Sequence, residues 1–191
     1  MRPSGIEAYD DGYFPRAHKG GKGFTSIAGV LADSPSRAVK LAWSFVRVDA
    51  NTSEKTIINI SNLLGGDVIL LDGVTYAGFD VVDPERLYVS TGKAVIAILT
   101  HPLNLSRIER ALRKHFADWK ERFTTIKSVY EKAFYVETPW RTLRVYSVGI
   151  AVDNATDLIR KLCIYSPIPE PLRIADKVAS AISRSIYKYY E

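Results

Sequence analysis

Cysteine is nearly absent from this chain of 191 residues, which contains a single one, Cys163. One cysteine excludes an internal disulfide, and such scarcity is typical of proteins in a reducing compartment. Cys163 lies between Leu162 and Ile164, and this apolar context favours a buried, inert thiol over a nucleophile. Thiol chemistry is therefore not the expected activity.

Long apolar runs are also missing. Even the longest, such as residues 94–99, are far too short to span a bilayer. The N-terminus, MRPSGIEAYDDG, lacks the apolar segment of a secretory signal peptide, so we expect a cytoplasmic protein with no membrane partner. No repeat, low-complexity tract or linker divides the chain, and its length predicts one domain over residues 1–191.

What the chain does contain is an ordinary globular composition with a positive charge balance. Hydrophobic residues make up 47% and charged residues 25%, while 26 Lys and Arg against 21 Asp and Glu give a net charge of +5. This balance favours a polyanionic partner such as nucleic acid, provided that the charge surrounds a site. Composition leaves the oligomeric state open.

The first half of the sequence predicts a sheet that opens as a meander. Strands are expected over residues 6–14, 24–32 and 38–48, the last two joined by the turn-forming residues 33–36. A helix over 53–64, capped by Asp49, Asn51 or Thr52, leads to a strand over 68–71. Its four consecutive apolar residues are typical of a strand buried on both faces, and the crossover is expected to be right-handed.

The second half predicts alternating helices and strands. We expect a helix over 81–91 with Asp83 and Pro84 at its start, a strand over 94–99 and a helical stretch over 103–132. A hairpin of 133–137 and 142–150, a helix over 154–162 and a closing helix over 169–190 follow. This order is that of an RNase H-like α/β domain, a mixed sheet of three antiparallel strands and then parallel strands, flanked by helices. In such a domain the first and fourth strands are neighbours.

Asp72 directly follows the buried strand, and Gly73 permits a sharp turn there. The carboxyl ends of strands in α/β sheets are the usual places for ligands. An isolated acid at this position most often caps a turn or a helix. The interpretation of Asp72 therefore depends on whether other acids meet it.

Two further strands bring acids toward Asp72. Neighbouring strands lie about 4.8 Å apart, so Asp10 of the first strand can face Asp72, whereas the adjacent Asp11 points to the opposite side. Asp49, at the end of the third strand, would complete the set. Gathered carboxylates repel one another unless a hard cation binds them, and oxygen ligands select Mg²⁺ or Mn²⁺ over zinc. The sequence thus predicts a site for one of these ions.

Two segments carry a family resemblance. Residues 68–99, VILLDGVTYAGFDVVDPERLYVSTGKAVIAIL, resemble the central segment of endonuclease V, and residues 169–180, PEPLRIADKVAS, resemble its closing Pro-Glu-Pro helix. Over nearly its whole length the chain is similar to the archaeal endonuclease dU family, which is related to endonuclease V. Asp-Gly after a strand is a weak motif alone, but its combination with PEPLRIAD is specific.

The resemblance implies site residues. Asp10 and Asp72 match the first-strand and Asp-Gly aspartates of the family, and Asp49 matches a position that endonuclease V fills with glutamate. Asp176 stands where RNase H-like nucleases often keep a fourth acid or a histidine. All four are candidate catalytic residues, the first three as metal ligands; on residue type alone, Asp176 is a solvated helix position.

Basic residues supply candidate nucleic-acid contacts. Lys19 and Lys22 lie in a glycine-rich segment over residues 15–23, whose ordinary interpretation is a solvated loop. Arg173 in the closing helix is a candidate phosphate ligand or a helix salt bridge. These three positions are the expected contacts to the polyanion.

Three elements implied by endonuclease V are missing. The chain lacks a Pro-Tyr-Ile-Pro wedge before the third strand, a histidine after the Asp-Gly turn and a lysine after the next strand. Gly78 and Thr100 occupy the approximate places of the last two. Because those elements handle the damaged base and the scissile phosphate, lesion specificity stays open.

The sequence therefore favours a Mg²⁺-dependent endonuclease that hydrolyses phosphodiester bonds in nucleic acid. The resemblance implies DNA containing deoxyuridine or deoxyinosine as substrate, and a role in DNA repair. One alternative is a non-catalytic RNase H-like protein that binds nucleic acid or a nucleotide. Another is a phosphohydrolase that acts on small nucleotides.

Overall fold

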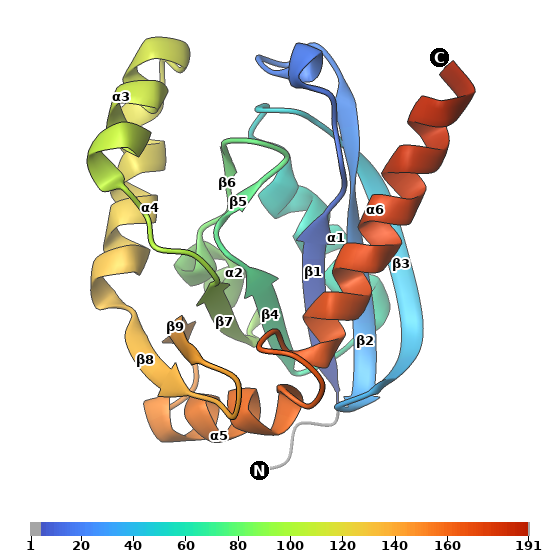
Figure 1. Ribbon diagram of the computed structural model, residues 1–191, viewed down its shortest axis with the longest axis vertical. Helices are drawn as coiled ribbons and strands as arrows, with labels where there is room; N and C mark the ends of the chain where they lie inside the picture. The colour runs from blue at the N-terminus through green and yellow to red at the C-terminus, as the bar shows by residue number, and fades with distance from the viewer. Residues whose placement is uncertain (1–4, 191) are drawn as a thin grey trace.

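A seven-stranded mixed sheet forms the centre of the protein, whose computed structural model describes residues 5–190 (Figure 1). The strand order is β3-β2-β1-β4-β7-β9-β8. An antiparallel meander comprises β1 (Ile6–Asp11), β2 (Phe24–Ser34) and β3 (Arg37–Arg47). Parallel to β1 run β4 (Val68–Asp72) and then β7 (Ala94–Leu99), and the antiparallel β9 (Thr142–Val148) and β8 (Phe134–Glu137) complete the sheet. The predicted fold class, with the first and fourth strands as neighbours, is confirmed.

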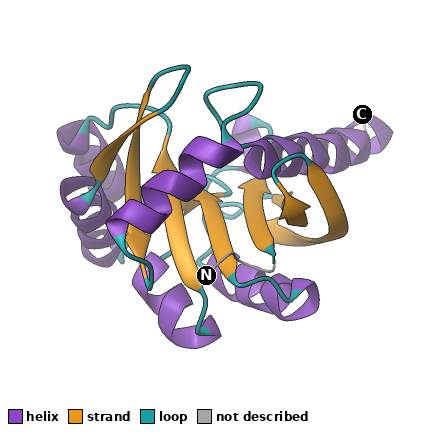
Figure 2. Cartoon of the chain, turned by 90° about the horizontal axis from the view of Figure 1, so that it is seen from below, coloured by secondary structure: helices purple, strands orange, loops and turns teal. Residues whose placement is uncertain are grey.

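Helices cover both faces of this sheet (Figure 2). One face carries α1 (Ser53–Leu64), α2 (Pro84–Thr91), α3 (Leu105–His115) and α4 (Trp119–Lys132). The other carries α5 (Val152–Leu162) and α6 (Glu170–Tyr190). None of the helices within residues 5–190 is long and apolar enough to cross a membrane.

The central strand β4 separates two hydrophobic cores. Ile69 and Leu71 pack with α1 and α2, whereas Val68 and Leu70 pack with α5 and α6. All four side chains are at most 5% exposed, and burying each one contributes about 1.5–3 kcal/mol. Packing on both faces fixes β4 in place, and with it the position of Asp72 at its end.

The N-terminus of α1 is capped by a residue far away in the chain. The carboxylate of Asp80 accepts hydrogen bonds from the backbone N–H groups of Thr52 (2.8 Å) and Ser53 (2.9 Å) and from the Ser53 hydroxyl (2.7 Å). Thr52 makes no capping bond with its own side chain. Of the predicted caps Asp49, Asn51 and Thr52, the last stands at the N-cap position, but a buried acid of another segment takes over the role of its side chain.

Two predicted helix boundaries also change. The helix expected from residue 81 begins at Pro84, with Asp83 as its cap, because residues 75–81 form a hairpin of β5 (Thr75–Tyr76) and β6 (Asp80–Val81). The stretch 103–132 is divided at Phe116, whose backbone is extended. Phe116 packs against the core, and the Arg122 guanidinium lies 4.5 Å from its ring.

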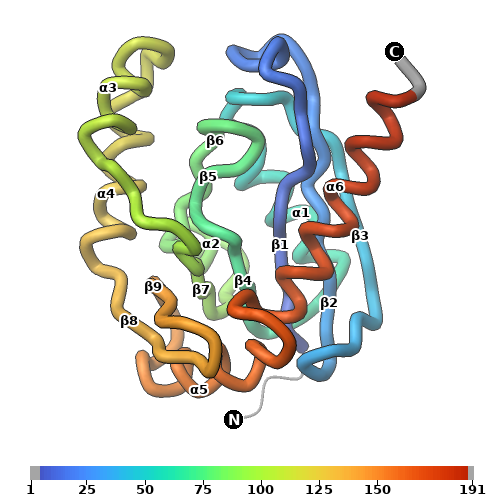
Figure 3. The backbone as a smooth tube through the Cα atoms, in the orientation of Figure 1, coloured from blue at the N-terminus to red at the C-terminus, as the bar shows by residue number. Residues whose placement is uncertain are grey.

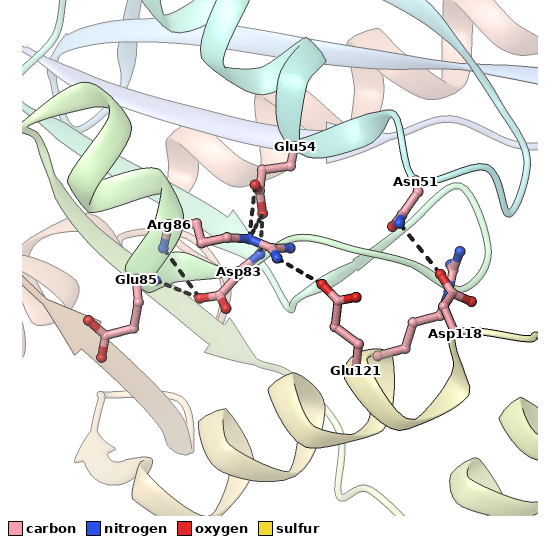
Figure 4. Close-up of polar contacts among 8 residues, drawn as sticks. Asn51, Glu54, Asp83, Glu85, Arg86, Asp118 and Glu121 are labelled. Atoms are coloured by element: carbon pink, nitrogen blue, oxygen red, sulfur yellow. Dashed lines mark hydrogen bonds and ion pairs between the residues drawn. The ribbon is translucent and has the colours of Figure 1, made fainter.

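A polar network joins α1, α2 and α4 (Figure 4). Arg86 of α2 pairs with Glu54 of α1 at 3.1 Å and with Glu121 of α4 at 2.9 Å. The N–H of Asp83 also donates to Glu54 (2.9 Å). Because Arg86 and Glu121 are largely exposed, these pairs add little stability; they align the three helices on that face.

Candidate active site

Asp72 lies at the carboxyl end of β4, where the chain turns sharply. Gly73 has a φ of 74°, a conformation that favours glycine, and its N–H donates to the carbonyl of Ile98 in β7 (2.9 Å). Asp72 is paired with Ile98 in the sheet register. Its carboxylate, only partly buried, therefore lies at the carboxyl end of β4, between the neighbouring strands β1 and β7.

Asp10 of β1 stands beside Asp72. The register pairs Ala8 with Leu70 and Tyr9 with Leu71, so the next residues along the two parallel strands are Asp10 and Asp72. Side chains alternate along a strand, and Ala8 and Leu70 both pack in the core beneath α5 and α6. Asp10 and Asp72 thus share the face of the sheet that α6 covers (Figure 1).

A third acid, Asp176, lies on α6, the helix that covers this face of the sheet. It comes one residue after Ala175, which is fully buried against the sheet. Its negative charge contributes to raising the pKa of both Asp10 and Asp72. The first strand, the fourth strand and the last helix each supply one acid to this face of the sheet.

The environment of these acids disfavours their ionisation. Burial, followed by repulsion from Asp72 and Asp11, raises the pKa of Asp10 to about 9. Burial, followed by the charge of Asp176, raises the pKa of Asp72 to about 6. Within residues 5–190, neither acid forms an ion pair with a basic side chain. Asp176, in contrast, pairs with Lys177 at 2.9 Å.

Asp11 points to the opposite face, as the alternation predicts. Its Oδ2 accepts a hydrogen bond from the N–H of Ala77 (2.8 Å). Burial raises the pKa of Asp11 to about 7, against the effect of this hydrogen bond. Asp11 thereby fixes the segment that follows Asp72 and Gly73.

Asp49 is engaged elsewhere. It lies in the turn after β3 with a φ of 63°, and its two oxygens accept hydrogen bonds from the N–H groups of Phe79 and Gly20, each at 2.8 Å. It is not among the main charged groups that shift the pKa of Asp10 or Asp72. The structure uses this acid to fasten two loops rather than to join the other acids.

The donor set fits a hard cation that keeps open positions. Among the described residues, no group of three or more His, Cys, Asp or Glu side chains is arranged to hold a metal ion. Asp10 and Asp72 instead offer two neighbouring carboxylates, neither of which is in an ion pair within residues 5–190. Mg²⁺ typically takes one or two carboxylates and fills its other positions with water and substrate phosphate, and this chemistry suits the pair.

Two basic residues that the sequence analysis did not select approach Asp72. His101 follows the end of β7, and Arg141 directly precedes β9, whose Arg144 pairs with Leu99. Both positive charges act to lower the pKa of Asp72, and both residues are exposed. His101 could have been found from the sequence, because it follows the end of a predicted strand. Arg141 could not, because its position depends on how β9 pairs with β7.

The expected phosphate contacts have different surroundings. Lys19 and Lys22 are both exposed in the loop between β1 and β2, and within residues 5–190 neither forms an ion pair. Arg173 donates to Oε2 of the buried Glu170 through Nε (2.9 Å) and Nη2 (2.7 Å). The helix salt bridge expected as the alternative role of Arg173 is thus formed.

Cys163 is buried, and burial raises its pKa to about 11.

Solved structures of other proteins share this architecture. A protein of unknown function from Archaeoglobus fulgidus has a TM-score of 0.78 and 20% identity, over 93% of this chain and 97% of that one. Endonuclease V of Ciona intestinalis, solved with a 24-mer DNA containing an inosine followed by a ribo-adenosine, has a TM-score of 0.61 and 14% identity, over 100% and 88% of the two chains. At these identities the likeness concerns the fold.

Sequence comparison identifies the family. A UPF0215 protein of Pyrococcus furiosus is 36% identical over 190 residues, covering 94% of this chain and 92% of its own length. The family model described as Endonuclease dU matches residues 4–183, a span that contains Asp10, Asp72 and Asp176. The chain therefore belongs to the endonuclease dU family.

Proposed function

We propose that the protein is a metal-dependent endonuclease that hydrolyses phosphodiester bonds in nucleic acid where Asp10 and Asp72 meet. The observation that carries this proposal is the pair of neighbouring acids at the sheet edge without a basic partner among the described residues. Membership of the endonuclease dU family supports it. So does the shared fold with endonuclease V.

In this proposal Asp10 and Asp72 hold a Mg²⁺ or Mn²⁺ ion, and Asp176 faces it from α6. An ion held by these residues would activate water for attack and would stabilise negative charge on the phosphate oxygens. Asp10 and Asp72 would be held in their ionised forms by such an ion, against the burial and the neighbouring negative charges that raise the pKa of both acids. Asp49, the expected third ligand, acts at a distance by holding the backbone at Gly20 and Phe79.

His101 and Arg141 are the groups that we assign to the scissile phosphate. Both are exposed, come from different elements and bring positive charge to the edge where Asp72 lies. An arginine can donate two parallel hydrogen bonds to a phosphate. These residues orient the phosphodiester against the acids, a task that endonuclease V assigns to elements missing from this sequence.

The proposed substrate is DNA that contains a deaminated base, deoxyuridine or deoxyinosine, and the proposed role is DNA repair. The family description refers to dU, and the Ciona protein was solved with inosine-containing DNA. The net charge of +5 suits a polyanionic substrate.

The test is cleavage of labelled oligonucleotide duplexes that contain deoxyuridine, deoxyinosine or only normal bases. Wild type with Mg²⁺ or Mn²⁺ is expected to cut a modified duplex, and EDTA or Asp72→Asn should abolish cutting. Asp157→Asn, the same change at an exposed position of α5, is the matched control. Equal cutting by wild type and Asp72→Asn would overturn the proposal.

One observation favours a second function, a protein that binds nucleic acid without cutting it. Gly78 and Thr100 occupy the approximate places of the histidine and the lysine that the resemblance to endonuclease V implies. This alternative predicts binding whose affinity falls steeply with salt, no cleavage with either cation, and no change in affinity when Mn²⁺ is added.

A further inference from the structure

A second candidate surface lies at the far end of α6. An open pocket of about 460 Å³ is bordered by the loop between β1 and β2, the start of β2, the end of β3 and the last turns of α6. Its lining includes His18, Lys22, Phe24, Phe45, Ile186 and Tyr187. Figure 3 shows the β1–β2 loop and the C-terminal part of α6 at the same end of the molecule, opposite α5.

Aromatic rings form the walls of this pocket. Phe24 and Phe45 are 53% and 46% exposed, and both lie on the face of the sheet that α6 partly covers. Tyr187 donates a hydrogen bond to the carbonyl of Phe24 and lies 3.0 Å from Nδ1 of His18. These contacts hold the helix against the loop, so the walls do not depend on a ligand.

Unpaired positive charge surrounds the rings. Lys22 lines the pocket, and the Arg47 guanidinium lies 5.4 Å from the centre of the Phe24 ring. Arg184 lies 4.7 Å from the ring of Tyr13. Within residues 5–190, none of these three cations forms an ion pair, and no acid lines the pocket. Exposed rings among free cations fit a ligand that is both aromatic and anionic.

The pocket is joined to the candidate active site through α6 and β1. Ser183 lines the pocket, seven residues after Asp176, which is about 10 Å along a helix at 1.5 Å per residue. Gly12, two residues after Asp10, donates its N–H to the carbonyl of Ser26 (2.8 Å), and Ser26 bonds to α6 through the carbonyl of Ala179. One nucleic-acid strand can therefore reach both places.

We propose that this pocket binds an unpaired base of the nucleic-acid strand a few nucleotides from the scissile phosphate. Phe24 and Phe45 stack on the base, while Lys22 and Arg47 contact the neighbouring phosphates. Base stacking on aromatic side chains requires a strand that is not paired in a duplex. This inference rests on the proposed function, and it adds a preference for substrates with a single-stranded segment beside the cleavage site.

The charge distribution favours nucleic acid over a second copy of the protein. An apolar stripe on the exposed edge strand β3, comprising Val39, Leu41 and Trp43, continues the surface of Phe45. Two copies that met there would oppose their unpaired cations, which is unfavourable. A polyanion neutralises the same cations and releases counterions.

The experiment is a binding titration by fluorescence anisotropy in EDTA, with a labelled single-stranded 20-mer and the matching duplex. Without a metal ion, no cleavage occurs and binding does not depend on the acids. The double variant Phe24→Leu, Phe45→Leu keeps apolar bulk and removes both rings, so single-strand affinity should fall about 10- to 100-fold, as expected for lost stacking. Duplex affinity should change less than about 3-fold, since paired bases do not stack on the protein.

Tyr165→Leu is the matched control, because Tyr165 is an exposed ring, 67% accessible, outside the pocket. It should leave both affinities unchanged. Lys22→Ala should lower the slope of log affinity against log salt by about 1, and it serves alone if the double variant does not fold. Unchanged single-strand affinity in the double variant, or in Lys22→Ala, would overturn the proposal.

Two other results have a defined meaning. A change from dimer to monomer in the double variant, measured by light scattering, would assign the rings to a protein interface and overturn the proposal. Loss of cleavage in Asp72→Asn with unchanged single-strand binding would support it, because the pocket and the acids then act separately. If the protein does not cut nucleic acid but the double variant loses single-strand affinity, the proposed nuclease function fails and the proposed base-binding pocket is still supported.

Discussion

Replacing Asp72 by asparagine is predicted to stabilise the protein when no divalent cation is present. Burial, reinforced by the charge of Asp176, raises the pKa of Asp72 from 3.8 to about 6. A pKa difference of 1 corresponds to about 1.36 kcal/mol, so ionisation of Asp72 costs the folded state roughly 3 kcal/mol relative to the unfolded chain. For a domain of this size, 1 kcal/mol changes Tm by about 2–4 °C. The expected rise in Tm is therefore roughly 6–12 °C.

The direction of the pH dependence follows from the raised pKa. Well below pH 3.8, Asp72 is protonated in both the folded and the unfolded chain, and near pH 4 the unfolded chain is only about half ionised, so wild type and variant should differ little. As the pH rises from 3.8 to about 6, the unfolded chain ionises first and the wild type loses stability. At pH 8 the loss is complete, and the variant should have its full advantage.

Thermal unfolding followed by circular dichroism, at pH 4 and pH 8 in EDTA, measures this effect. Asp157→Asn, which removes an exposed acid of α5, should leave Tm at pH 8 unchanged. Mg²⁺ or Mn²⁺ should raise the Tm of wild type but not that of Asp72→Asn, because the cation needs both carboxylates. A variant that melts at or below the wild-type temperature at pH 8 would refute the reasoning.

Three further changes have defined outcomes. Gly12→Ala places a methyl group 2.4 Å from Oγ of Ser183 and 2.6 Å from the carbonyl of Ala179, so α6 must move. This displacement should lower the cleavage rate about 100-fold. Full activity would show that α6 need not approach so closely. Asp80→Ala should lower the free energy of unfolding in urea by about 2–4 kcal/mol, because three hydrogen bonds at α1 are lost; a loss below about 1 kcal/mol would indicate another cap. Arg141→Ala should raise KM about 10-fold with little change in kcat if it binds the phosphate, and an unchanged KM in steady-state kinetics would exclude that contact.

The acidic pair could be predicted because its signals are local. The apolar run before Asp72 marks the end of a buried strand, and the order of the elements then makes the strand of Asp10 its neighbour. Asp49 carries the same signal, an acid at a strand end. Its oxygens instead accept hydrogen bonds from backbone N–H groups of two loops. These bonds depend on how the loops pack, which cannot be predicted from the spacing of residues in the sequence.

Features that depend on tertiary contacts could not be predicted from the sequence. Asp80 caps a helix that begins 27 residues earlier in the chain, and nothing near Asp80 indicates a partner at that distance. The break at Phe116 leaves the apolar periodicity of 103–132 nearly intact, so the pattern predicts one helix where packing produces two. Arg141 reaches the site only because β9 returns antiparallel to β7.

The position of α6 has a consequence for synthesis of the protein. One acid of the site is the tenth residue of the chain, and another lies on the final helix, which locks onto Gly12 and Ser26. A ribosome-bound or prematurely terminated chain that lacks α6 leaves Asp10 and Asp72 uncovered, without their third acid. The three acids can therefore come together only after α6 has docked on the sheet.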